Sequence, residues 1–186
     1  MLKKKTFILL SLILTTFACT INVGGPEYPQ KTIPSSPSIV EAMKEQFKVV
    51  FEAGANGDPI IITFTESQLT SLLSQRFESE EDPFFTEPQV HLRDGKMTIY
   101  GKAKQRYFVA TIKIVVRIFV DENGQPDIYI ESADFGPLPI PDTLSGSLSA
   151  IIKEAYTGAI GPVATGFRIE KIGIGEGFLA IMGRVK

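Results

Sequence analysis

Few side chains in this sequence could carry covalent or acid–base chemistry. The 186 residues contain one cysteine, Cys19, and one histidine, His91. A thiol nucleophile would have to be Cys19, and a serine nucleophile would need His91 as its base. His91 alternates with Val90 and Leu92, which predicts a solvent-facing position on a strand, and no G-x-S-x-G turn accompanies it. We therefore expect a protein that is not an enzyme.

Acidic side chains gather in one short stretch, at Glu78, Glu80, Glu81 and Asp82. Carboxylate oxygens are the ligands that Ca²⁺ prefers, but the stretch lacks the one-apart acidic spacing and the glycine of an EF-hand loop. A solvated loop is the favoured interpretation. No group of His and Cys can hold zinc, and the glycines of residues 173–177 are not followed by the Lys and Ser or Thr of a phosphate-binding loop. We expect neither a metal nor a cofactor.

The position of Cys19 suggests a different chemistry. Three lysines at positions 3–5 precede an uncharged stretch, residues 6–18, which ends in the small residue Ala18. A basic start, a short apolar core and a small last residue are the parts of a secretory signal. The apolar run is shorter than the roughly 20 residues that a membrane-spanning helix needs.

The pair Ala18-Cys19 resembles the lipobox of bacterial lipoproteins, in which the signal is cut before a cysteine whose thiol carries a diacylglyceryl group. The resemblance implies that residues 1–18 are a signal peptide. It also implies that Cys19 is the lipid attachment site and that the protein is anchored to the extracytoplasmic face of the cell membrane. The alternative is an ordinary signal peptide or an uncleaved anchor, in which Cys19 has no role.

The rest of the chain has the composition of one acidic domain behind a tether. Without the three signal lysines, 16 Lys and Arg remain against 21 Asp and Glu, a net charge of −5. Such a domain has no electrostatic reason to bind nucleic acid or an anionic surface. Residues 19–37 include four prolines and two glycines, which predicts a tether, and residues 38–186 form a single domain without a cysteine.

The domain begins with alternating helical and strand patterns. Residues 38–53 have apolar side chains at helical spacing, with Ser38 and Glu41 as a capping pair. Residues 59–64 are a short apolar strand. Thr65 and Gln68 form a second capping pair, at the start of a helix whose apolar stripe is Leu69, Leu72, Leu73 and Phe77.

A run of strands follows. Residues 88–103 form a hairpin with Asp94-Gly95 at its turn. Residues 107–120 alternate so regularly that we expect one continuous strand at the middle of the sheet, about 46 Å long at ~3.3 Å per residue. A strand of this length must bend because its twist accumulates. Gly101 and Ala103 on the preceding strand would make room for the bend.

The remaining elements complete an α+β pattern. Residues 127–135 pair back on the long strand, Asp142 or Thr143 starts a third helix, and residues 167–185 form a last hairpin around Gly175-Glu176-Gly177. We expect a long curved antiparallel sheet wrapped around a helix, with helices on one face.

Residues 60–150 resemble a known group of proteins in pattern and order. The stretches "ITFTESQLTSLL", "PQVHLRDGKMTIYGKA" and "FGPLPIPDTLSGSL" are similar to the YpmS-like family of exported bacterial proteins and to the YceB and LmeA groups, near the tubular lipid-binding superfamily. The resemblance implies an apolar groove that binds a lipid or another amphiphile in the cell envelope. It implies no catalytic residue.

The expected groove is lined by apolar side chains from four regions of the chain. The alternative is a dry core in an envelope scaffold that binds a protein partner through an exposed strand edge. Phe84 and Phe85 are adjacent, so they either close over the groove, dip into a membrane or tuck under their loop. The lining residues are Leu69, Leu72, Leu73 and Phe77; Phe84 and Phe85; Ile112, Ile114, Val116 and Ile118; and Leu144, Leu148, Ile151 and Ile152.

Overall fold

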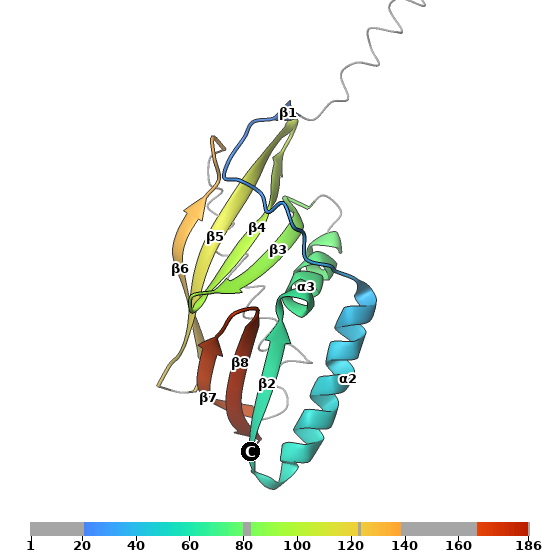
Figure 1. Cartoon of the computed structure of the whole chain (residues 1–186), viewed down its shortest axis with the longest axis vertical. Helices are drawn as coiled ribbons and strands as arrows, with labels where there is room; N and C mark the ends of the chain where they lie inside the picture. Colours follow the sequence, from blue (N-terminus) through green and yellow to red (C-terminus); the bar gives the residue numbers. More distant parts are fainter. Residues whose placement is uncertain (1–20, 80–82, 123, 139–166, 186) are drawn as a thin grey trace, which may run out of the picture.

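A computed structural model describes residues 21–79, 83–122, 124–138 and 167–185 (Figure 1). These residues form a strongly curled, mainly antiparallel sheet, a second smaller sheet and two long helices, so the predicted α+β fold with a long curved sheet is confirmed. The elements are β1 (Ile21–Asn22), α2 (Pro37–Ala53), the 3-10 helix η2 (Gly54–Asn56), β2 (Pro59–Thr65), α3 (Glu66–Glu78), β3 (Phe85–Arg93), β4 (Lys96–Gln105), β5 (Phe108–Val120), β6 (Pro126–Asp134), β7 (Phe167–Ile174) and β8 (Phe178–Val185).

Strand β5 lies in the middle of the large sheet, as its alternating pattern predicts. One of its edges pairs with β4 over residues 108–116. Its other edge is shared, because β1 pairs in parallel with its first residues and β6 pairs antiparallel with residues 113–120. A register shift between Val115 and Val116 adds a local irregularity where β6 pairs. The β3–β4 hairpin turns at Asp94 and Gly95, both with positive φ, as a type I′ turn requires.

The smaller sheet has the strand order β2-β8-β7. Helix α2 lies beside it, whereas α3 packs mainly against β3 of the large sheet (Figure 1). Thr65 ends β2 and caps α3, and the reciprocal bonds with Gln68 confirm the predicted capping box. The sequence pattern places the N-cap of α2 at Ser38, which is two residues too late. Ser36 is the N-cap residue and Pro37 follows it, so Ser38 is already inside the helix.

Residues 21–36, which we call the N-terminal strap, lie along the domain rather than away from it (Figure 1). The expected tether over residues 19–37 therefore needs correction. At its start the strap continues the sheet beside β5, and at its end it is bonded to β3 and α3. Its bonds include Ile21 N to Tyr107 O (2.7 Å), Val23 N to Val109 O (2.9 Å), Thr111 N to Gly24 O (2.9 Å), Tyr28 OH to Glu87 O (2.8 Å), Ser36 N to Ser71 Oγ (3.1 Å) and Ser67 Oγ to Pro34 O (2.6 Å).

Glycine explains why the strap can approach so closely. Gly25 has a φ of +118°, and a Cβ on it would lie 2.1 Å from the carbonyl oxygen of Thr111. An L-residue is strained at such a φ and has no room at this site. The prolines and glycines of this segment therefore fit it for close docking on the sheet edge, whereas composition alone suggests a loose linker.

Gly101 serves a different purpose from the one expected of it. A Cβ on Gly101 would lie 2.2 Å from two atoms of the Phe85 ring, so the glycine leaves space for that ring on the inner face of the sheet. Phe85 is buried there, with its ring centroid 4.7 Å from that of Phe77 in an edge-to-face pair. The glycine thus permits the contact between the curved sheet and α3.

We predict that Gly101→Ala lowers the free energy of unfolding by about 1–3 kcal/mol, because the buried ring of Phe85 cannot move aside freely. Gly173→Ala is the matched control, since that glycine also lies in a strand and a Cβ there meets nothing within 4 Å. Urea denaturation of both variants measures the difference. An equal, small effect of both substitutions would show that Gly101 is not a packing requirement.

Candidate functional site

The described part of the predicted groove lining comes from helix α3, the start of β3 and strand β5. All ten described lining residues belong to one hydrophobic core. Phe77, Phe85, Ile112, Ile114 and Val116 are buried, whereas Leu69, Leu72, Leu73, Phe84 and Ile118 are half-buried. The other four, Leu144, Leu148, Ile151 and Ile152, lie outside the described residues, and so does Cys19.

The two adjacent phenylalanines have different positions. Phe85 points into the core and Phe84 packs against the core's margin, while the carbonyl oxygen of Phe84 accepts a bond from Lys104 N at 2.8 Å. Both rings are therefore held by the domain. This arrangement matches the interpretation in which the pair tucks under its loop.

Burial of the inner face decreases along β5. Ile112, Ile114 and Val116 are at most 1% exposed. Ile118 and Val120, two and four residues further on, are half-buried. Half-buried Ile128 and Ile130 of β6 accompany them. The apolar face is thus closed from Ala110 to Val116 and more accessible toward Val120.

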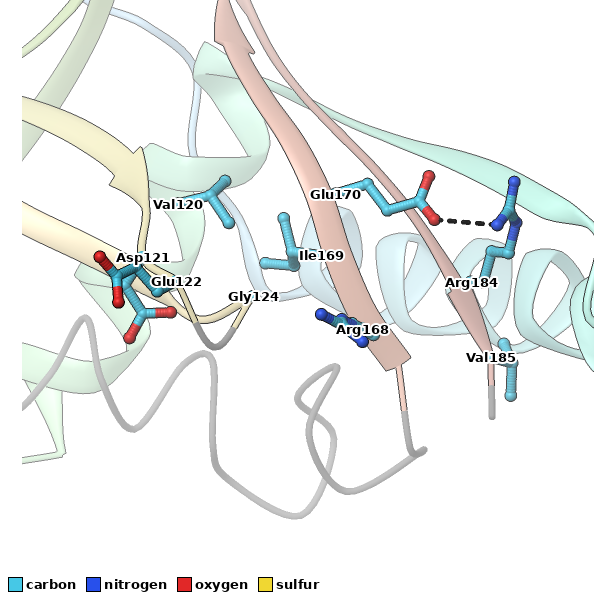
Figure 2. A pocket seen from close by; sticks show the side chains of 9 residues that line it. All are labelled: Val120, Asp121, Glu122, Gly124, Arg168, Ile169, Glu170, Arg184 and Val185. Atoms are coloured by element: carbon cyan, nitrogen blue, oxygen red, sulfur yellow. Dashed lines mark ion pairs between the residues drawn. The ribbon is translucent and has the colours of Figure 1, made fainter.

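An open cavity of about 560 Å³ adjoins this accessible end. It lies where the end of β5 and the β5–β6 turn meet strands β7 and β8 of the smaller sheet (Figure 2). Its volume falls in the range of ligand pockets, about 300–1,000 Å³. The residues around it are Val120, Asp121, Glu122, Gly124, Arg168, Ile169, Glu170, Arg184 and Val185.

The cavity combines apolar and charged walls. Val120, Ile169 and Val185 come from three different strands and supply apolar surface. The carboxylates of Asp121 and Glu122 lie on the side of the β5–β6 turn, whereas charged side chains of β7 and β8 lie opposite (Figure 2). Glu170 and Arg184 form an ion pair there at 3.2 Å. The exposed guanidinium of Arg168 stands between the two sides (Figure 2).

The outer edge of β3 is closed by side chains of α3 and by a turn. Val90 N donates to Thr70 Oγ1 at 3.0 Å, and Leu92 N donates to Glu66 Oε1 at 2.8 Å. The carbonyl oxygen of Leu92 accepts a bond from Gly177 N at 2.9 Å. A paired edge offers few free groups to an incoming strand, so this side of the sheet is a poor site for β-augmentation.

His91 is half-buried, although its alternation predicts a fully solvent-facing position. Its ring meets that of Tyr100 edge to face at 5.4 Å, and its Nε2 is buried without a hydrogen-bond partner among the described residues. Burial holds the pKa of His91 below its usual value of 6.5. The carboxylate of Glu66 opposes this effect and the guanidinium of Arg93 adds to it.

The described residues show neither a metal site nor a membrane span. Within them, no group of three His, Cys, Asp or Glu side chains could hold a metal ion. Residues 80–82 of the acidic stretch are outside the described part of the chain. No described helix is both long and apolar enough to cross a bilayer.

No family model matches the chain, and no curated protein matches it. The resemblance to the YpmS-like and tubular lipid-binding proteins therefore stays a prediction from the sequence.

We predict that His91 makes the domain less stable in weak acid. The pKa of His91 is lower in the folded protein than in the unfolded chain, where it is about 6.5. The contribution of His91 to the free energy of unfolding is therefore fully present above about pH 6.5, and it is lost as the pH falls through the lower folded pKa. His91→Phe keeps an aromatic ring beside Tyr100 and removes the titration. Urea denaturation of both proteins between about pH 7.5 and pH 5.5 should show a smaller loss of stability in the variant. Parallel losses would contradict the prediction.

Proposed function

We propose that the protein is a membrane-anchored lipoprotein of the cell envelope that binds a lipid or another amphiphile without catalysing a reaction. The observation that carries the proposal is the apolar inner face of β5, which becomes accessible next to an open cavity with charged walls. An amphiphile has the same two parts. Its chain would lie on the apolar surface around Ile118 and Val120, and its polar head would lie among the charges of the cavity.

Physical chemistry supports this division of the site. Burial of an acyl chain stabilises the complex by ~0.8 kcal/mol for each CH₂ group. The guanidinium of Arg168 can donate charge-assisted hydrogen bonds to a carboxylate or phosphate head. The carboxylates of Asp121 and Glu122 on the other side favour a head that also carries a positive group.

A second candidate function is an envelope scaffold that binds a protein partner, and the outer edge of β6 favours it. In the described chain β6 pairs with β5 alone, and its residues 131–134 are all exposed. Tyr129 adds an exposed aromatic side chain on this strand. A partner strand could therefore pair with β6, in contrast to the closed edge of β3. Native mass spectrometry of the protein from its host distinguishes the two functions, because co-purifying lipid favours the first and a bound protein the second.

We predict that Cys19→Ser releases the protein from the membrane fraction and leaves its domain folded. Stable attachment needs two acyl chains or an equivalent second signal, and the diacylglyceryl group supplies them only through the thiol. Metabolic labelling with a fatty acid and cell fractionation measure the effect, and circular dichroism of the variant checks its fold. Absence of label on the unaltered protein would show that it is not lipidated.

We predict that Arg168→Ala weakens the uptake of a fluorescent fatty acid about fivefold, corresponding to ~1 kcal/mol for an exposed charge contact. Lys171→Ala is the matched control, because Lys171 is an exposed cation of the same strand that does not line the cavity. Fluorescence titration of both variants against the unaltered protein gives the ratio. No uptake by the unaltered protein, or equal losses in the two variants, would argue against the cavity as the site of the head group.

A further inference from the structure

Three large apolar side chains are exposed together at one end of the large sheet. Ile21 is 54% exposed, Tyr107 68% and Phe108 44%. They come from distant parts of the chain, but Ile21 is the register partner of Phe108, and its N–H donates to the carbonyl oxygen of Tyr107 at 2.7 Å. We call Ile21 with residues 104–108 the hairpin tip; it lies at the β1 end of the sheet (Figure 1).

The two strands that form the hairpin tip carry positive charges only. Residues 96–120 contain six Lys and Arg and neither Asp nor Glu. Three of the six are ion-paired with glutamates of β3 and β6, and Lys113 lies over the ring of Tyr100. The tip itself carries Lys104 and the exposed Arg106. Residues 96–120 are thus a run of positive charge within a domain whose net charge is −5.

Arg106 occupies its position at an energetic cost. It has a φ of +57° in the two-residue turn between β4 and β5. Glycine adopts this conformation readily, whereas other residues pay roughly 1–3 kcal/mol there. The exposed turn therefore carries an arginine at a position where glycine would suit the backbone better.

The position of Cys19 in the chain suggests which surface the tip contacts. Ile21 follows Cys19 by two residues, and two residues span at most about 7 Å. The strap fixes Ile21 on the sheet edge, so an acyl group on Cys19 would bring the bilayer surface next to the tip. Aromatic side chains with neighbouring cations are the composition that interfacial anchors use at anionic membranes.

We propose that the hairpin tip is a second membrane contact, which inserts Ile21, Tyr107 and Phe108 into the headgroup region of an anionic bilayer. The exposed guanidinium of Arg106 then faces the lipid phosphates. The proposal rests on the lipid anchor of the proposed function. The contact would also set the orientation of the domain. Val120, which lines the cavity, is 12 residues along β5 from Phe108, so the cavity lies at most about 40 Å from the tip at ~3.3 Å per residue.

The test uses the fact that the chain contains no tryptophan. Tyr107→Trp places one fluorophore at the tip, and Tyr129→Trp is the matched control, because Tyr129 is 59% exposed. Tyr129 pairs with Arg117, nine residues along β5 from Phe108, or about 30 Å at ~3.3 Å per residue. Each full-length variant is extracted from membranes and reconstituted into vesicles of equal phosphatidylcholine and phosphatidylglycerol, with and without brominated acyl chains.

We expect the indole at position 107 to lose roughly half of its emission to the brominated lipid, as for an interfacial aromatic ring, and the indole at position 129 to lose none. Both variants could float with the vesicles and yet show no quenching at position 107, or equal quenching at both positions. Either result overturns the orientation and leaves the anchor standing. Failure of both variants to float overturns the anchor and the orientation together.

A second variant tests the charge. Arg106→Gly suits the backbone of the turn and removes the guanidinium. In the Tyr107→Trp protein it should reduce quenching in vesicles that contain phosphatidylglycerol and leave it unchanged in pure phosphatidylcholine. Unchanged quenching in both kinds of vesicle would show that the cation does not contribute to the contact.

Discussion

The length of β5 is the constraint on which the rest of the structure depends. A strand of 13 residues presents more backbone donors and acceptors than one neighbour of ordinary length can pair. β4 accompanies its first nine residues, β6 accompanies its last eight, and the strap supplies partners at its start. Because the pairing with β4 ends at Val116, the last residues of β5 continue with β6 as their only paired strand in the described chain, and β5 contacts β7 of the smaller sheet. The junction of the two sheets, and with it the cavity, follows from this mismatch in length.

The same mismatch gives β5 two different ends. From Ala110 to Val116 the inner face is buried completely. The strap and β4 pair with the backbone on both edges near the start of the strand. Near its end the inner face is half-buried, and the surroundings change from apolar to charged within two residues, from Val120 to Glu122. Close packing is thus confined to one half of the strand. A ligand that needs both an apolar wall and a charged rim has only the other half to bind.

Alternation and capping chemistry allowed much of the fold to be predicted from the sequence. The continuous β5, the Asp94-Gly95 turn and the Thr65–Gln68 cap all depend on neighbours within a few residues, which a sequence displays directly. The strap could not be predicted in this way. Its prolines and glycines are typical of a linker, and only the carbonyl oxygen of Thr111, 86 positions from Gly25, explains the glycine.

For a related reason, the sequence did not reveal the polar side chains that close the edge of β3. Thr70 and Glu66 lie on a helix that the sequence defines by its leucines, yet they pair the free edge of β3. No local pattern marks a side chain whose partner is a distant backbone N–H. The cavity escaped prediction similarly, because its walls come from β5, β7, β8 and the turn before β6, and only the approach of the two sheets brings them together.

The docked strap changes what a lipid on Cys19 would mean for the domain. A free tether of 19 residues would let the domain turn in any direction above a bilayer. With the strap hydrogen-bonded from Ile21 onwards, only two peptide steps separate the sheet from Cys19, so rotation about a lipid on this residue would be restricted. The start of β5 would then be held toward the lipid headgroups and its end away from them. An amphiphile in the cavity would therefore be held at a distance from the anchoring membrane that the length of β5 determines.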